Sequence, residues 1–193
     1  LGLLAQPFGY AQAPAPQVAP DFAPTAVIPL DAAVRTGTLP NGVRYYVRQN
    51  ARPENRVMLQ LAVKAGSVDE TDAQQGLAHF VEHMAFNGTK NFPGNELVRF
   101  FQSIGMSLGA DANASTSFDQ TVYSLRLPTE NPAIMTRALQ VLDDWAHQVT
   151  FEDVEIDRER GVIVEEWRLR RGAAARVSDA VLPTLLKGSR YAE

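Results

Sequence analysis

Two histidines and a glutamate lie within five consecutive residues of this 193-residue chain, in the segment His79-Phe80-Val81-Glu82-His83. On an α-helix, residues three and four positions apart share one face, so the side chains of His79, Glu82 and His83 point to the same side. Two neutral imidazoles on one rigid turn form half of a zinc site. A neighbouring carboxylate that is not itself a ligand can accept a proton from metal-bound water.

The arrangement H-x-x-E-H is the inversion of the H-E-x-x-H motif of zinc proteases, and it keeps two His and one Glu on one helix face. The alternative is a pair of solvent-exposed histidines, one of them paired with Glu82. Buried imidazoles need partners, and the residues around the motif predict a largely buried helix. These apolar neighbours are Leu77, Ala78, Phe80, Val81 and Met84.

A catalytic zinc also needs a third protein ligand and one open position for water. His147 is the only other histidine, although its position near a helix end favours an ordinary surface or partly buried imidazole. Carboxylates of the charged segment 153–171 are better candidates: Glu155, Glu159, Glu165 and Glu166. Glu159 and Glu166 are seven residues apart and share nearly one helix face. The residues alone leave these alternatives open.

The composition limits the remaining classes of function. The chain is 45% hydrophobic and has a net charge of −4, which fits a folded domain and gives no whole-chain argument for nucleic-acid binding. Cysteine is absent, which excludes disulfides, thiolate metal sites and cysteine nucleophiles. No apolar run reaches the roughly 18 residues of a membrane span.

The N-terminal residues predict export and a tether. The apolar segment 1–5 and the small residues Ala11 and Ala13 are typical of the end of a secretory signal, so we interpret 1–13 as its remainder. An Ala-rich leader with a chance A-x-A pattern is the alternative. Proline and alanine dominate 14–29, which predicts an extended linker. We expect the folded domain over 30–193.

Hydrophobic periodicity and turn residues predict a mixed chain of strands and helices. The expected strands are 43–47, 56–63, 107–112 and 120–127, and the expected helices are 77–86, 95–104, 132–149 and 153–171. Strands and helices alternate with hairpin-like turns. The pattern favours an α+β domain in which helices pack on one face of a mainly antiparallel sheet.

Two separate segments together carry a family resemblance. His79–His83 and the segment Glu159-Arg160-Gly161-Val162-Ile163-Val164-Glu165-Glu166 resemble the pitrilysin/insulysin family of zinc peptidases, the M16 family of inverzincins. The segments 39–45, 66–67, 76–78 and 86–89 resemble other parts of the family domain. The resemblance covers residues from about Leu30 onward. It implies an M16-type domain, one Zn²⁺ per chain and, from its bacterial periplasmic members, an exported protein.

The resemblance also implies roles for single residues. The implied metal ligands are His79, His83 and Glu166, with Glu165 as the alternative to Glu166. Glu82 is the implied general base, which takes a proton from zinc-activated water and delivers it to the leaving amine. Glu159 matches an acid that helps to hold the site. The implied reaction is hydrolysis of short or unfolded peptides.

The segment 111–116 resembles the family's substrate-binding edge strand, where an extended peptide adds to the sheet by backbone pairing. Asn113, Ala114 and Ser115 are the implied substrate-binding residues. Asn and Ser would equally suit a polar hairpin turn, which is the alternative interpretation.

The enzymes of the family resemble a clam shell of four related domains, and this chain is long enough for one. We therefore expect a first domain that is cut short and needs further homologous domains or a partner subunit for activity. A non-catalytic scaffold subunit and a zinc-binding module of the same fold remain alternatives. No nucleic-acid partner and no membrane span are expected.

Overall fold

The structure, a computed structural model, describes residues 25–192. The predicted signal remainder 1–13 and most of the linker 14–29 lie outside the described residues, so both stay predictions. The chain divides into two compact units, Leu1–Asn50 and Ala51–Glu193. No helix among residues 25–192 is both long and apolar enough to cross a membrane.

The described part of the first unit is a β-hairpin. Strands β1 (Val34–Thr38) and β2 (Arg44–Arg48) pair antiparallel, with Val34 opposite Arg48. Gly42 in the connecting turn has φ 87°, a conformation that glycine adopts without a steric penalty. The predicted strand 43–47 is thus confirmed with a shift of one residue. Strand β1 was not predicted from the sequence.

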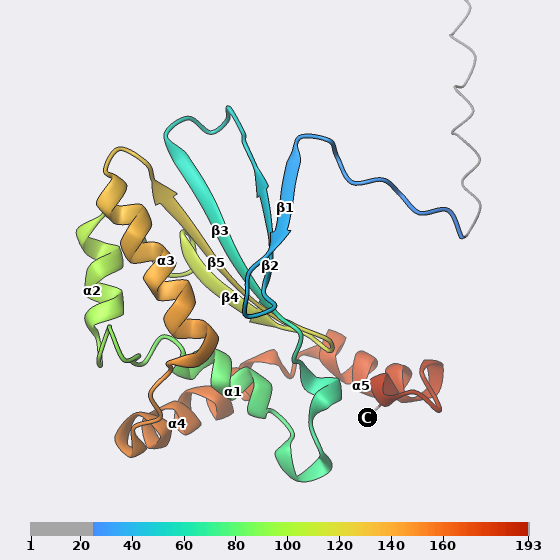
Figure 1. Ribbon diagram of the computed structural model, residues 1–193. Coiled ribbons are helices and arrows are strands. Elements are labelled where there is room, and N and C mark those ends of the chain that lie inside the picture. Colours follow the sequence, from blue (N-terminus) through green and yellow to red (C-terminus); the bar gives the residue numbers. More distant parts are fainter. Residues whose placement is uncertain (1–24, 193) are drawn as a thin grey trace, which may run out of the picture. The chain divides into compact units, whose positions relative to one another are not determined.

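The second unit holds a three-stranded antiparallel sheet in the order β3-β5-β4 (Figure 1). Its strands are β3 (Arg56–Val63), β4 (Ala112–Thr116) and β5 (Thr121–Pro128). The predicted strand 56–63 is confirmed with identical bounds, because its alternating apolar residues face the core with a period of two. β5 is the central strand, so β4 is an edge among the described residues.

Five α-helices belong to the described part of this unit. They are α1 (Leu77–Met84), α2 (Glu96–Ser103), α3 (Pro132–His147), α4 (Asp153–Arg170) and α5 (Ala173–Leu185). Short 3₁₀ turns span Ser67–Asp69, Asp72–Gln74 and Arg190–Ala192. Figure 1 shows α2 and α3 along one face of the sheet, and α1 packs against both α4 and β4. The α+β class with helices on one sheet face is therefore confirmed.

The core lies between the sheet and α1, α2 and α3. Its largest fully buried apolar side chains are Phe92, Phe101, Met84, Leu97, Leu125, Leu127 and Val141. Trp145 on α3 stacks on Tyr123 of β5 at 5.1 Å, and its Nε1 donates a 2.8 Å hydrogen bond to the carbonyl of Ala85. This bond ties the exit of α1 to α3.

One predicted strand was wrong in its position. Residues 107–112 were expected to be extended, but residues 109–111 form a turn, and strand β4 begins only at Ala112. The amides of Asp111 and Ala112 donate to the carbonyl of Ser107, and the Asp111 carboxylate accepts from the Ser107 amide. An aspartate that closes a turn on its own backbone in this way competes with strand formation.

Candidate metal centre

Gly76, with a φ of 88°, directly precedes helix α1, and a carboxylate from the preceding loop caps the helix. Oε2 of Glu70 accepts a 2.7 Å hydrogen bond from the Gly76 amide, and Oε1 accepts a 2.6 Å bond from the Ala78 amide. A carboxylate at a helix N-terminus accepts hydrogen bonds from the free backbone amides there, and its negative charge interacts favourably with the positive end of the helix dipole. Glu70 therefore orients the helix that carries His79, Glu82 and His83, a role the sequence reasoning missed.

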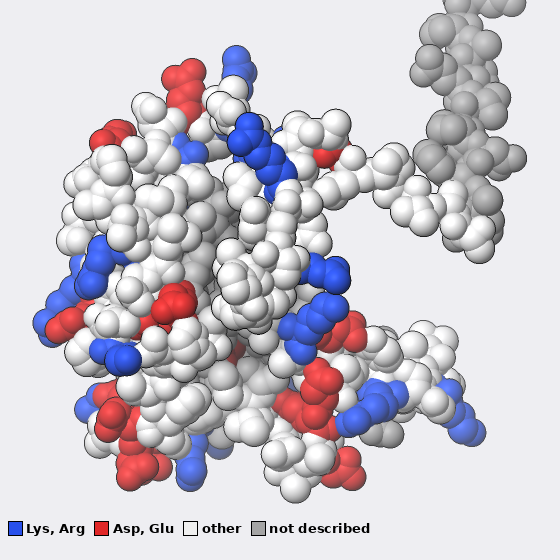
Figure 2. Space-filling model, in the orientation of Figure 1, with Lys and Arg blue, Asp and Glu red and all other residues white. Residues whose placement is uncertain are grey.

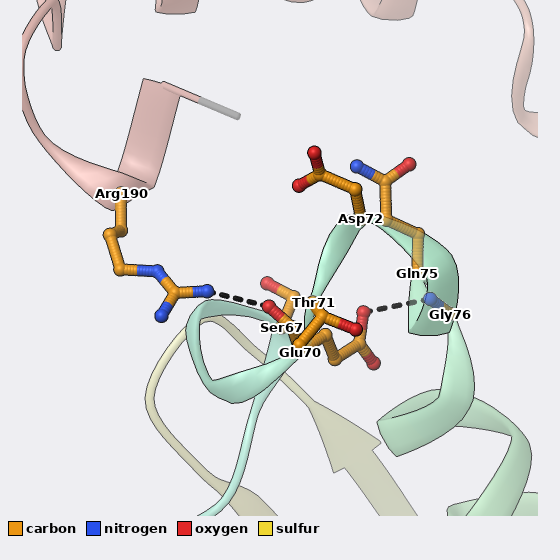
Figure 3. Close-up of a pocket in the computed structure, with 7 residues that line it drawn as sticks. All are labelled: Ser67, Glu70, Thr71, Asp72, Gln75, Gly76 and Arg190. Carbon is orange, nitrogen blue, oxygen red and sulfur yellow. Dashed lines mark hydrogen bonds between the residues drawn. The ribbon is translucent and has the colours of Figure 1, made fainter.

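A shallow polar hollow of about 240 Å³ lies beside this cap (Figure 3). Arg190 donates a 2.5 Å hydrogen bond to the Glu70 carbonyl, while the Glu70 carboxylate points to Gly76. The hollow is lined by Ser67, Glu70, Thr71, Asp72, Gln75, Gly76 and Arg190. Since this set contains neither histidine of the motif, the hollow is distinct from the candidate metal centre.

Helix α4 brings one carboxylate to the two imidazoles of α1. Nε2 of His79 and Nε2 of His83 lie 3.1 Å apart. Oε2 of Glu166 lies 3.5 Å from the first nitrogen and 3.8 Å from the second. All three ligand atoms lie within 4.8 Å of one another. Two ligands on one tetrahedral zinc ion, each bonded at about 2.0–2.1 Å, would be about 3.3 Å apart, so the spacing fits such an ion.

A second carboxylate of α4 orients one of these rings. Oε1 of Glu159 lies 2.7 Å from Nδ1 of His83, and Oε2 accepts a 2.6 Å hydrogen bond from Nδ2 of Asn87. A carboxylate that accepts from Nδ1–H leaves the lone pair of Nε2 free for a metal. Asn87, just beyond the end of α1, thus positions Glu159. Its contact lay beyond sequence reasoning because the two residues are 72 positions apart.

Glu82 is nearly buried, with 8% of its surface exposed. Its Oε2 accepts a 2.5 Å hydrogen bond from the hydroxyl of Thr116 at the end of β4. Burial, and after it the nearby Glu82 charge, raises the pKa of Tyr123 to about 12. The Glu82 carboxylate therefore contacts the end of β4 while it belongs to the same helix as the two imidazoles.

Burial lowers the pKa of His79, and the neighbouring His83 lowers it further, while the Glu82 and Glu166 carboxylates partly offset both effects. The neutral imidazole is the form that binds a metal ion. Near neutral pH, the His79 ring is therefore in its ligand form. Two imidazole nitrogens and one carboxylate oxygen are a donor set that suits zinc.

The other candidates for a third ligand are engaged elsewhere. Glu165 pairs with Arg168 on the exposed side of α4, and Glu155 pairs with Arg158 at 2.6 Å. His147 is 59% exposed and lies 3.9 Å from Asp143. Among residues 25–192, Glu166 is the acidic residue that forms a candidate metal cluster with both histidines of the motif.

Asn113, Ala114 and Ser115 lie in β4, so the hairpin-turn interpretation of this segment was wrong. They pair with Ser124, Tyr123 and Val122 of β5, and no strand of the described unit pairs with the opposite edge of β4. A free strand edge offers backbone amides and carbonyls to an extended peptide. Binding of substrate by these three residues stays a prediction.

The chain is similar to zinc proteases of bacteria. It is 45% identical over 165 residues to the probable zinc protease PqqL of Escherichia coli strain K12, and 39% identical over 171 residues to that of Haemophilus influenzae. These alignments cover 86% and 89% of this chain, but the chain spans only 18% of the length of each relative.

Two solved structures agree with this similarity. The crystal structure of the periplasmic protease PqqL from Escherichia coli superimposes with a TM-score of 0.81, covering 86% of this chain and 18% of that one. The crystal structure of the first half of the same protease superimposes with a TM-score of 0.82, and the match covers 86% of this chain and 35% of that one. Both are 45% identical to this chain. Residues 45–191 match the insulinase family. The chain therefore belongs to the insulinase family of peptidases, peptidase family M16.

Proposed function

We propose that this chain is the metal-bearing part of a zinc-dependent endopeptidase that hydrolyses bonds in short or unfolded peptides. The observation that supports it best is that His79 Nε2, His83 Nε2 and Glu166 Oε2 lie within 4.8 Å of one another. Glu82 directly precedes the ligand His83 in the sequence. Relatives named zinc proteases share this part of the chain at 39–45% identity.

Each of the clustered side chains has a distinct role in this proposal. His79, His83 and Glu166 hold one zinc ion, and Glu159 keeps the His83 ring in the tautomer that binds metal. A bound zinc supplies a lowered pKa for water and a polarised substrate carbonyl. Glu82 accepts the proton of the attacking water and returns it to the amine of the leaving peptide.

The proposed substrate is an extended peptide that pairs with the free edge of β4. Asn113, Ala114 and Ser115 are the proposed substrate-binding residues. In the register with β5 the backbone groups of Asn113 and Ser115 bond to that strand, so Ala114 offers its backbone groups to the free edge. The strand ends at Thr116, which contacts Glu82. Backbone pairing requires an unfolded segment, because the amides of a folded protein are already hydrogen-bonded. The proposal therefore predicts a preference for short or flexible peptides.

We further propose that efficient cleavage requires additional domains or a partner subunit. Helices α4 and α5 expose a series of large apolar side chains, which favours cover by another protein surface. They are Val154, Val162, Val164, Trp167 and Leu169 on α4, and Val177, Val181, Leu182 and Leu185 on α5. On the face of the molecule that Figure 2 shows, acidic and basic groups are interspersed. Because the solved relative is described as periplasmic, we also propose export to the periplasm.

The substitution Glu82→Gln tests the proposal. We expect the wild-type chain to bind one zinc ion, and the longer polypeptide or complex that contains it to cleave unfolded peptides in a zinc-dependent way. Glu82→Gln should keep the metal and lose at least about 100-fold in turnover, because the general base is removed. A scaffold subunit or zinc-binding module would show no effect of this change. Zinc content by atomic absorption and cleavage of a fluorogenic peptide are the two measurements.

A further inference from the structure

Thr116 is the last residue of β4 and the donor to the proposed general base. Its Oγ1 lies 2.5 Å from Oε2 of Glu82, although the two residues are 34 positions apart. Glu82 belongs to α1, which packs directly against β4. The hydrogen bond therefore joins the strand on which we place the substrate to the helix that carries the metal ligands.

The neighbouring Thr121 determines which way the Thr116 hydroxyl points. Thr121 faces Thr116 across the β4–β5 hairpin, is 4% exposed, and donates a 3.0 Å hydrogen bond to the carbonyl of Ala65. The two threonine oxygens lie 3.3 Å apart. A hydroxyl carries a single hydrogen, and Thr121 uses its own on Ala65. Thr116 therefore receives no hydrogen from Thr121 and directs its own hydrogen to the closer Glu82 carboxylate.

Because of this bond, the two carboxylate oxygens of Glu82 differ in their hydrogen-bond partners. Oε2 is occupied by Thr116, and no donor among residues 25–192 reaches Oε1. No buried side-chain oxygen or nitrogen of the described residues lacks a partner, so Oε1 must be open to solvent. Water can approach this oxygen, and a proton accepted there would leave the Thr116 bond intact.

We infer that Thr116 is a positioning residue that holds Glu82 by Oε2 and presents Oε1 to the reacting water. The inference rests on the proposed function, in which Glu82 is the proton acceptor. A peptide paired with Asn113–Ser115 lies next to Thr116 along the same strand. The orientation of the base is thus built into the strand that aligns the substrate.

Thr116→Val keeps the branched shape that a strand favours and replaces the hydroxyl by a methyl group, which cannot donate a hydrogen bond. In the longer polypeptide or complex that carries the activity, we expect kcat to fall about 10–100-fold, the range seen when groups that orient a site are removed. KM should stay within about twofold. Thr116→Ser should restore most of kcat, since serine keeps the donor. Ser117→Ala is the matched control, because among residues 25–192 the Ser117 hydroxyl bonds to the Gln120 carbonyl alone, at 3.1 Å.

Thermal unfolding provides a readout that does not depend on activity. Thr116→Val should lower Tm by about 3–6 °C when Glu82 is present, and by less than about 1 °C when Glu82 is Ala, because the bond is then already absent. Thr116→Val should leave the zinc affinity unchanged in both backgrounds, with Glu82 present and with Glu82→Ala.

Full kcat in Thr116→Val, or an equal Tm shift in both backgrounds, would overturn the role of Thr116. A wild-type protein without zinc-dependent cleavage would instead overturn the proposed function, and the Tm cycle would still decide whether Thr116 holds Glu82.

Discussion

Nδ1 of His83 lies 2.7 Å from Oε1 of Glu159, so helix α4 orients an imidazole of helix α1 through a single hydrogen bond. Both side chains are mostly buried, with 17% and 13% exposed. The same helix supplies Glu166 two turns later, on nearly the same face. One helix therefore carries both the third candidate ligand and the group that orients the second.

The first prediction concerns Glu159. Glu159→Ala should weaken zinc binding about 10–100-fold, because the His83 ring loses the acceptor that keeps its tautomer and orientation. Competition with a chromophoric chelator measures the affinity. Asp157→Ala, a change at an exposed acid of the same helix, is the control and should bind zinc like the wild type. Equal affinities for both variants would contradict the role of Glu159.

The second prediction separates two adjacent glutamates. Glu166→Gln should reduce zinc affinity at least about 100-fold, since a charged ligand is lost, whereas Glu165→Gln should change it less than about twofold. The two substitutions have the same chemistry and lie about 100° apart around α4. Isothermal titration of the metal-free protein with zinc is the measurement. The reverse order of effects would assign the third ligand to Glu165.

The third prediction concerns the cap of α1. Glu70→Ala should reduce the free energy of unfolding by about 1–2 kcal/mol, because the amides of Gly76 and Ala78 lose their acceptor. Asp72→Ala removes an exposed acid from the same loop and should cost less than about 0.5 kcal/mol. Urea unfolding followed by circular dichroism compares the two. If Glu70→Ala has the same free energy of unfolding as the wild type, the cap does not stabilise the fold.

The fourth prediction is a pH dependence at Asp144. Burial alone would raise the pKa of this carboxyl, but hydrogen bonds from Thr89, Asn91 and Gln140 outweigh burial and lower it. A carboxyl whose pKa is lowered in the folded state stabilises the fold at pH values above its pKa in the unfolded chain, about 3.9. This contribution is lost as the pH falls through the pKa in the folded state. Asp144→Asn should therefore cost about 2–3 kcal/mol at pH 7, and less below about pH 4.

Unfolding of the wild type and of Asp144→Asn by denaturant, between pH 3 and pH 7, measures this difference. Asp143→Asn is the matched control, since that neighbouring carboxyl is about half exposed. A gap between wild type and Asp144→Asn that stays constant down to pH 3 would show that the charge of Asp144 does not contribute.

The local elements were largely predictable from the sequence. A period of two defined the strand 56–63, and a helical period placed His79, Glu82 and His83 on one face, because both signals depend on neighbours within a few residues. The error at 107–112 arose where a side chain, that of Asp111, closes a turn on the backbone. Such a contact overrides propensity and leaves no periodic pattern.

The partners of the motif were beyond local signals. The residues alone left several glutamates and His147 open as third ligand, and the family resemblance favoured Glu166. Packing of α4 against α1 brings Glu166 to the imidazoles and turns Glu165 to solvent. Asn87, Glu70 and Thr116 acquire their contacts in the same way. The sequence by itself determined the two histidines and the glutamate on one helix face, since helix geometry is local. Only tertiary structure decided which distant side chains meet them, because that depends on how whole elements pack.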